Sequence, residues 1–416
     1  MQRRVMVDVP LVGAALLLSI YGVAMVYSAG QTDVPTVAAH AYKAQIVWVL
    51  VGMTAAACAA RASVRLIEWL TWPAYLISIL LLLVTLVFGS GAGTAASVKG
   101  WLTIGGHRLG QPSEFAKVTV VLMLARVLGA RREAPRSLLE LWQPAMVVLV
   151  PWLLIMAQPD LGTGIVFIGI CFAMLYWSGV PLPLLILIAS PAVSLILAFN
   201  TSLWGAWFLA LLALVLWYRP FMAEGIALML ANVAMGVIAP ILWERLAPYQ
   251  RHRLLVFLDP SIDPRASGWH VIQSQVAIGS GGLLGKGFTM GTQKRLAFLP
   301  AQHTDFIFAV VGEEMGFLGV TVALSLFLFL LLRTVRVAER ANDSYSSLIA
   351  FGLASSWLVH VIVNVGMTLN LMPITGIPLP FFSYGGSFML ACWLSIGILV
   401  RISMEGRGGR VGELAV

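Results

Sequence analysis

Long apolar segments, separated by short polar turns, dominate the hydrophobic pattern of this 416-residue chain. A helix needs about 20 apolar residues to cross the ~30 Å hydrocarbon core of a bilayer. The apolar runs are continuous rather than alternating, which favours helices over the strands of a barrel. We therefore expect an all-α polytopic membrane protein, a bundle of about twelve transmembrane helices at residues 9–29, 43–60, 66–89, 114–130, 142–158, 162–179, 182–199, 203–218, 223–243, 306–332, 346–369 and 384–403.

Composition supports the same class of protein. Hydrophobic residues make up 60% of the chain and charged residues 11%, and the mean hydropathy is +0.92. These values exclude a water-soluble globule, a disordered chain and a disulfide scaffold. The first apolar run is longer than the core of a secretory signal peptide, so we expect an uncleaved first span. The three cysteines lie in apolar runs and are expected to be small buried side chains.

The arginines and lysines between the spans predict how the bundle is oriented. An even number of spans places both termini on one side of the membrane, and fifteen cations lie on that side. The short loops of the other side hold four, and seven more lie in the long loop of residues 244–305, where the charge rule loses force. We therefore expect cytoplasmic termini, with function located at the outer loops, residues 90–114, 244–305 and 370–383.

The fourth predicted span opens with charged residues of both signs. Pro112 and Ser113 suit the start of a helix, and Glu114 and Lys117 follow three residues apart, on one face. An unpaired cation is costly inside a membrane, so Lys117 needs an acidic partner and a position facing the bundle interior or a wet cavity. Two interpretations stay open: a helix-end lysine paired with Glu114, or a residue of an outer cavity.

A second group of titratable residues lies where the tenth predicted span begins. Asp305 directly precedes the apolar run, beside His303, and is either a helix cap or a carboxylate at the outer boundary, at the depth of Lys117. Glu313 and Glu314 follow eight and nine residues later, ~12–14 Å deeper at 1.5 Å per residue. Carboxylates at that depth need partners or protonation, and a buried network and a proton path are equal alternatives.

Three further candidates are cations of the long outer loop. Arg251, Arg253 and Lys286 are of the type that binds phosphate or anionic lipid, with a solvated surface as the alternative. Lys286 lies near the end of a glycine-rich stretch, residues 279–287, that superficially resembles a phosphate-binding loop. That stretch follows no strand, which excludes a nucleotide-binding fold.

Two more candidates lie in outer turns. Asp160 sits in a tight turn, where it either caps the next helix or joins the site. Ser383 belongs to a Pro- and Gly-rich segment, residues 376–387, at the outer entry to the last span. Irregular backbone is tolerated there only beside protein or a cavity, so this segment forms either the floor of a pocket or a helix-entry turn.

At these residues the chain resembles the SEDS family of shape, elongation, division and sporulation proteins, the group of RodA and FtsW. The GKG and GTQ pieces are most similar to RodA, the elongation member. Seven blocks carry the resemblance, in the family's order and spread over nearly the whole chain: QPSEFAK (111–117), QPDLGT (158–163), YQRHR (249–253), QSQVAIGSGGLLGKGF (273–288), GTQ (291–293), HTDFIF (303–308) and GIPLPFFSYGGS (376–387).

Two features depart from the family pattern. The family has ten spans, so residues 181–223 are interpreted as an inserted helical hairpin, which preserves the parity of the spans and hence the orientation. The spacing from Arg108 to Gln111 is one residue longer than in the family, so the role of Arg108 does not carry over directly. The expected organisation is a single membrane domain over residues 1–416, with a large outer loop at residues 244–305.

The resemblance implies a glycosyltransferase that polymerises lipid II, a disaccharide-pentapeptide on undecaprenyl pyrophosphate, into peptidoglycan during cell elongation. It implies inversion at the anomeric carbon in one displacement, with Asp305 as the general base that takes a proton from the attacking hydroxyl. Lys117 is the second expected catalytic residue, because the departing pyrophosphate needs fixed cations. Substrate contacts are expected from eight further residues: Glu114, Arg108, Asp160, Arg251, Arg253, His303, Lys286 and Ser383.

The resemblance also implies the surroundings of the protein. We expect the bacterial cytoplasmic (inner) membrane, with the active face outside. The expected partners are a class B penicillin-binding protein that crosslinks the product, other membrane proteins of the elongation complex, and membrane lipids, but no nucleic acid. No cofactor or metal is assigned, and dependence on a divalent cation stays open.

Two other functions stay open from the residues alone. A bundle with intramembrane ions suits a transporter that flips lipid II, and a non-catalytic scaffold for partner enzymes is the third reading. Against flipping, the chemistry-bearing residues gather on one side and the chain has no internal repeat. Against scaffolding, a scaffold has no use for Lys117 and Asp305 in the bilayer. An assay that scores polymer against translocation of labelled lipid II separates these functions.

Overall fold

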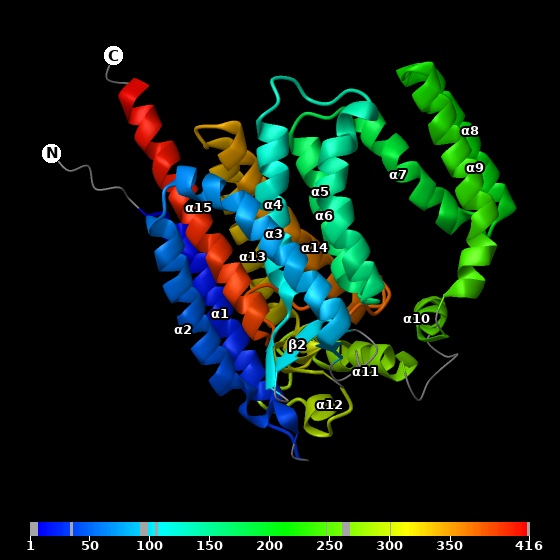
Figure 1. The fold of residues 1–416 in the computed structure, drawn as a ribbon. Coiled ribbons are helices and arrows are strands. Elements are labelled where there is room, and N and C mark those ends of the chain that lie inside the picture. Colours follow the sequence, from blue (N-terminus) through cyan, green and yellow to red (C-terminus); the bar gives the residue numbers. More distant parts are fainter. Residues whose placement is uncertain are drawn as a thin grey trace.

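The computed structural model describes residues 7–33, 36–91, 99–104, 107–246, 248–259, 267–299 and 301–413. Long helices running roughly alongside one another form most of the molecule (Figure 1). The helices are α1 (Val9–Ala29), α2 (Ala41–Arg61), α3 (Val64–Phe88), α4 (Pro112–Gly129), α5 (Trp142–Ala157), α6 (Leu161–Trp177), α7 (Leu182–Leu197), α8 (Thr201–Tyr218), α9 (Met222–Arg245), α10 (Pro248–Leu258), α11 (Ser267–Ser280), α12 (Thr292–Arg295), α13 (Ile307–Glu339), α14 (Ser344–Thr368) and α15 (Gly386–Glu413), with 3-10 turns η1 (Val37–His40) and η2 (Leu139–Leu141).

Every one of the twelve predicted spans coincides with a helix, and the predicted starts agree with the observed ones within two residues. In the described part of the chain, nine helices are long and apolar enough to cross a membrane. The other three predicted spans are α4, which carries charged residues, and the shorter α6 and α7. The chain is thus an all-α, multi-pass membrane protein, and the exact number of crossings stays a prediction.

Burial separates central from peripheral helices. Helices α14 and α15 are the most enclosed of the nine, with 72% of the apolar window buried in each, whereas 6% is buried in α8. In α8, all of which is described, Leu211 is the one buried residue. Helices α8 and α9 stand at one edge and reach the bundle through α7 (Figure 1). This placement suits a peripheral hairpin, and the interpretation of residues 181–223 as an insertion stays a prediction.

The end of the bundle away from the C-terminus holds structure that the hydrophobic pattern missed. Strands β1 (Gly89–Ser90), β2 (Trp101–Ile104) and β3 (His107–Gly110) form a small antiparallel sheet before α4, where we expected only a loop. Helices α10, α11 and α12 lie at the same end, within the predicted loop of residues 244–305 (Figure 1). Strands of two to four residues are too short to show a period in the sequence.

The cysteines correct one expectation. Cys392 is buried, but Cys171 is only partly covered and Cys58 is exposed on α2. An apolar helix in a membrane presents one side to lipid, so a small apolar residue there needs no protein cover. Hydropathy alone therefore does not distinguish a core position from a lipid-facing one.

Candidate active site

Lys117 and Glu114 form a buried ion pair at the start of α4. Pro112 is the first residue of the helix, and the two charged side chains follow in its first two turns. Lys117 Nζ lies 2.7 Å from Glu114 Oε2, and each side chain is 4% exposed. The pairing predicted from their spacing is confirmed.

His360 in the middle of α14 is the second partner of Lys117. The ammonium group of Lys117 donates to His360 Nε2 at 2.8 Å, and His360 Nδ1 lies 2.9 Å from the carbonyl oxygen of Pro378. Since Nδ1 faces a carbonyl acceptor, it carries the ring proton and leaves Nε2 free to accept. The Lys117 ammonium group also lies 4.9 Å from the ring centroid of Phe388. His360 was not among the candidates expected from the sequence, although a histidine inside an apolar span is itself a signal of function.

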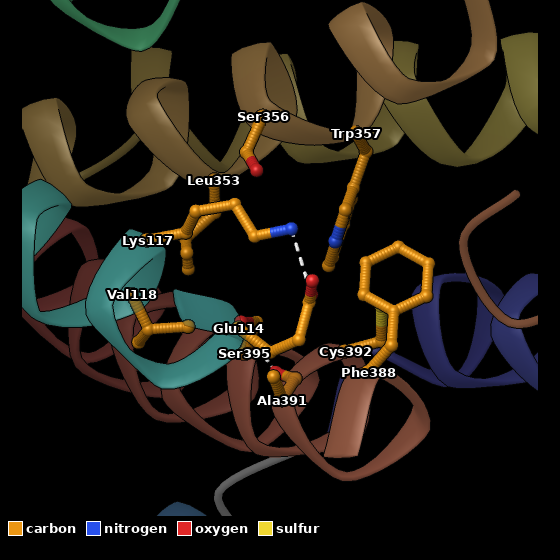
Figure 2. A pocket seen from close by; sticks show the side chains of 10 residues that line it. All are labelled: Glu114, Lys117, Val118, Leu353, Ser356, Trp357, Phe388, Ala391, Cys392 and Ser395. Carbon is orange, nitrogen blue, oxygen red and sulfur yellow. Dashed lines mark hydrogen bonds and ion pairs between the residues drawn. The ribbon is translucent and has the colours of Figure 1, made fainter. Parts of the chain in front are cut away.

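A small cavity adjoins this pair. It has a volume of about 20 Å³, room for one water molecule, and the side chains of Ser356 and Ser395 add hydroxyl groups to its wall. Figure 2 shows Glu114 and Lys117 pointing toward each other across it, with Trp357, Phe388 and Cys392 closing one side. The pair is therefore enclosed by α4, α14 and α15 rather than open to the outer surface.

Asp305 lies in the turn that leads into α13, against the segment of residues 376–387. Asn364 in α14 donates to two carbonyl oxygens, that of Asp305 at 2.9 Å and that of Ile377 at 2.7 Å. Gly376 has a φ of +73°, and a Cβ built there would lie 3.3 Å from Asp305 Oδ2. A glycine thus lets the chain turn in left-handed conformation directly beside the carboxylate.

His360 and Asn364 connect the two candidate catalytic residues. They lie four residues apart on one face of α14, about 6 Å along the helix axis at 1.5 Å per residue. His360 contacts Lys117 and the Pro378 carbonyl, while Asn364 binds the Asp305 carbonyl. The anchors of Lys117 and Asp305 are therefore one helical turn apart, which agrees with the similar depth expected for the two residues.

Ser383 joins the segment of residues 376–387 to the turn that precedes Asp305. Its hydroxyl donates to the Thr304 carbonyl at 2.7 Å and accepts from the Leu379 amide at 2.9 Å, and the side chain is buried. The Tyr384 amide donates to the His303 carbonyl at 3.0 Å. Ser383 thus fixes the backbone at the site, and its contact with substrate stays a prediction.

His303 is partly enclosed beside Asp305. Its ring lies 5.5 Å from that of Tyr384, measured between centroids. Burial lowers the pKa of His303, because the charged imidazolium is less well solvated there than in water. The imidazole is therefore neutral at pH 7 and can accept or donate a hydrogen bond without adding charge to the site.

Asp160 lies at the edge of the same site. It caps α6: Oδ1 accepts from the Thr163 amide at 3.0 Å and Oδ2 from the Thr163 hydroxyl at 2.8 Å. Gln111, just before α4, donates to Asp160 Oδ2 at 3.4 Å. Gly162 lies against the Thr375 carbonyl, 2.7 Å from where a Cβ would stand. The cap is confirmed, and it also places Asp160 between the start of α4 and the segment that contacts Asp305.

Glu313 and Glu314 are partnered by lysines of the outer loop, so a buried network is the arrangement observed. Lys286 Nζ lies 2.8 Å from Glu313 Oε1, and Lys294 Nζ lies 2.7 Å from Glu314 Oε1. Gly316 interrupts α13 just beyond them with a φ of 61°, and the amide of Phe317 there donates to the Gly282 carbonyl. The kink thus lets the glycine-rich loop pack at the depth of the two carboxylates.

Lys294 and Gln302 fasten the loop to α1. Lys294 has no exposed surface and donates to both the carbonyl and the hydroxyl of Ser28, each at 2.7 Å. Burial lowers the pKa of Lys294, and the hydrogen bond that its ammonium group donates to Glu314 opposes that shift. Gln302 donates to the Ala29 carbonyl at 2.7 Å. The last turn of α1 therefore binds the chain at two points before Asp305, at Lys294 and at Gln302.

The remaining candidates are placed less directly. Lys286 is 26% exposed and engaged with Glu313, so its contact with substrate stays a prediction. Arg251 folds back onto the end of α9, where it donates to the carbonyls of Leu246 and Glu244. The side chains of Arg108 and Arg253 lie outside the described residues. Among the residues that the structure describes, no group of three or more His, Cys, Asp or Glu is arranged to hold a metal ion.

A comparison with protein families decides what kind of protein carries this site. The model of the FtsW, RodA and SpoVE family, described as cell cycle protein, matches residues 9–207 and 205–408. The chain belongs to this family. Four blocks of the resemblance meet at the site: the starts of α4 and α6, the turn before α13 and the segment of residues 376–387.

Individual relatives and solved structures agree with this family membership. The chain is 34% identical to the peptidoglycan glycosyltransferase RodA of Treponema pallidum, over 93% of this chain and 95% of the relative. It is 34% identical to MrdB of Escherichia coli K12, over 93% and 90%, and 33% identical to a probable FtsW of Geobacter metallireducens, over 96% of each. The structure of RodA from Thermus thermophilus is similar with a TM-score of 0.61 and 25% identity, over 95% of this chain and 96% of that one.

A chain from a structure on the coordination of polymerization and crosslinking by a peptidoglycan synthase complex is similar with a TM-score of 0.70. The identity is 28%, and the match covers 96% of this chain and 98% of that one. The chain is nearly as similar to the FtsW relative as to the RodA relative. Sequence identity therefore does not decide whether this chain is more like RodA or more like FtsW.

Proposed function

We propose that this family member is a peptidoglycan glycosyltransferase that polymerises lipid II, with Asp305 as the general base. The observation that carries the assignment is the arrangement on α14, where His360 contacts Lys117 and Asn364, one turn away, binds the backbone carbonyl of Asp305. The relatives named peptidoglycan glycosyltransferase support the reaction class.

The proposed reaction is a single displacement with inversion. The 4-hydroxyl of the acceptor glycan attacks the anomeric carbon of the donor, the bond to the pyrophosphate breaks, and Asp305 takes the hydroxyl proton. No covalent intermediate with the enzyme forms. Negative charge grows on the departing pyrophosphate, and cations of the outer face stabilise it.

Lys117 acts in this scheme as a member of an enclosed pair rather than as a free cation. An ammonium group has three N–H donors, and Glu114 and His360 engage two of them. Its contribution is to hold α4, α14 and, through the Pro378 carbonyl, the segment beside Asp305 in one arrangement.

The finer assignment is to cell elongation, with a class B penicillin-binding protein as the crosslinking partner. The GKG and GTQ pieces, packed on the kink of α13, support the elongation role. The similarity to a chain of a peptidoglycan synthase complex supports the partner. The charge distribution supports a cytoplasmic (inner) membrane location with the site on the outer face.

The test is polymerisation of labelled lipid II by the purified protein in liposomes. We expect glycan strands from the wild type and a 10²–10⁴-fold lower rate, roughly, from Asp305→Asn, since general-base catalysis contributes about that much. The matched control is Asp33→Asn, an outer-face aspartate whose pair with Arg295 is about half exposed. Wild-type protein that moves lipid II across the bilayer without lengthening it contradicts the proposal, as does an Asp305→Asn variant with the wild-type rate.

A further inference from the structure

A stripe of arginines lies at the end of the bundle opposite the proposed active site. Arg333, Arg336 and Arg340 follow one another at helical spacings of three and four residues near the C-terminus of α13, so they share one face. They line a cavity of about 20 Å³ together with Asp8, Val337 and Ser403, where α13 meets the start of α1 and α15.

The charges around this cavity do not balance. Asp8 engages Arg333 through two hydrogen bonds, of 2.9 and 3.0 Å, and also accepts from the Ser403 hydroxyl at 3.2 Å. The other two arginines, Arg336 and Arg340, have exposed side chains, and no carboxylate in the described part of the chain pairs with either of them. Like charges four residues apart on a helix repel each other. Beside this cavity, the exposed face of α13 therefore offers an anion two guanidinium groups that no described carboxylate pairs with.

The depth of the cavity indicates which anion is at hand. Helix α13 has 33 residues, and about 20 suffice to cross the hydrocarbon, so its last two turns extend to the level of the lipid headgroups. The charge distribution places this end of the bundle at the cytoplasmic leaflet, which carries anionic lipids. Guanidinium groups bind phosphate oxygens through paired, charge-assisted hydrogen bonds.

We propose that Arg336 and Arg340, with the Asp8–Arg333 pair as a rigid wall, bind the headgroup phosphate of an anionic phospholipid. The bound lipid lies between the ends of α13 and α15 and the start of α1. The site is separate from the proposed catalytic residues, so its test does not depend on the enzymatic activity.

The test measures retention of phosphatidylglycerol by the purified full chain, using native mass spectrometry in detergent with phosphatidylcholine and inorganic phosphate as parallel probes. We expect preferential retention of phosphatidylglycerol by the wild type. The double variant Arg336→Gln/Arg340→Gln should bind it roughly 10- to 30-fold more weakly, given the strength of an arginine at a membrane surface. The matched control is Arg131→Gln/Arg132→Gln, which removes two arginines from another loop at this side and should leave retention unchanged.

Three outcomes overturn the proposal. Equal retention by the wild type and the Arg336→Gln/Arg340→Gln variant shows that these two arginines do not bind the headgroup. An equal loss in the control variant shows that net charge alone governs retention. Displacement of phosphatidylglycerol by inorganic phosphate at the same concentration shows a site for a free anion. Since both arginines are exposed, the double variant is expected to fold. A third variant, Arg336→Lys/Arg340→Lys, tests whether the charge is sufficient without the planar group.

Discussion

At the scale of single residues, the site depends on side chains that connect elements rather than on isolated charges. Asn364 is fully buried and supplies the partner for two backbone carbonyls, those of Asp305 and Ile377. Neither carbonyl belongs to a helix that could satisfy it, so the amide group is what keeps the two chain segments in place. Asn364 therefore positions Asp305 without itself reacting.

Replacing Asn364 with alanine should lower both stability and activity. Two buried carbonyl groups lose their donor, at a cost of about 1–3 kcal/mol each. We expect a lower midpoint of thermal unfolding and, per folded molecule, a reduced polymerisation rate with little change in affinity for lipid II. The matched control is Asn232→Ala in α9, which also removes a buried amide with two acceptors, Ser190 and the Leu228 carbonyl. The control should lose stability alone, and an equal loss of rate in both variants contradicts a positioning role.

His303 makes stability depend on pH in a direction that follows from its environment. Burial lowers the pKa of the folded state below the unfolded value near 6.5, so the unfolded chain takes up the proton first as the pH falls. Its contribution to stability is complete above pH 6.5 and is lost as the pH falls through that value towards the folded pKa. The midpoint of thermal unfolding should therefore drop more between pH 7.5 and pH 5.5 in the wild type than in His303→Gln. Identical pH profiles contradict the assignment.

At the scale of elements, the sequence predicts what depends on local pattern and misses what depends on long-range contact. The twelve apolar runs and the cap of α6 by Asp160 follow from neighbouring residues alone. His360 and Asn364 were missed because an apolar helix with occasional polar residues gives no hint of which segment it faces. The lysine partners of Glu313 and Glu314 could not be assigned either, since the kink at Gly316 that admits the loop is a property of packing.

The buried ion pair of Lys294 and Glu314 should stabilise the attachment of the outer loop to the bundle more than the exposed pair of Arg295 and Asp33 does. Neither side chain has exposed surface, so Lys294→Met leaves a buried carboxylate without its cation, at a cost on the order of 3–5 kcal/mol. The double variant Lys294→Met/Glu314→Met removes both charges and should recover most of the loss. By contrast Arg295→Met breaks the exposed pair with Asp33, worth about 0–1 kcal/mol. Thermal unfolding in detergent measures all three, and equal effects of the two single variants contradict the ranking.

At the scale of the whole molecule, the two ends of the bundle differ in their chemistry. One end carries arginines, including the stripe on α13, together with the start of α1 and the C-terminal part of α15 that lie beside it. The other carries the sheet and α10 to α12 (Figure 1). The turn with Asp305, which directly precedes α13, belongs to this end as well. An enzyme needs this asymmetry if its lipid-linked substrate is used on one face of the membrane. The proposed function therefore depends on which end of the bundle faces the outside of the cell.

That premise can be tested with single cysteines in a variant lacking the three native ones, of which Cys58 is itself exposed. Leu284 is 79% exposed in the outer loop, and Arg132 is exposed in the loop between α4 and α5 at the opposite end. Short cytoplasmic loops are enriched in Arg and Lys, so the arginine-rich end should face the cytoplasm. A membrane-impermeant thiol reagent added to intact cells should label Leu284→Cys and reach Arg132→Cys only after the membrane is opened. The opposite result is labelling of Arg132→Cys in intact cells with Leu284→Cys protected. It would mean that the bundle is inverted and that Asp305 lies on the cytoplasmic side, where glycan strands outside the membrane cannot be polymerised.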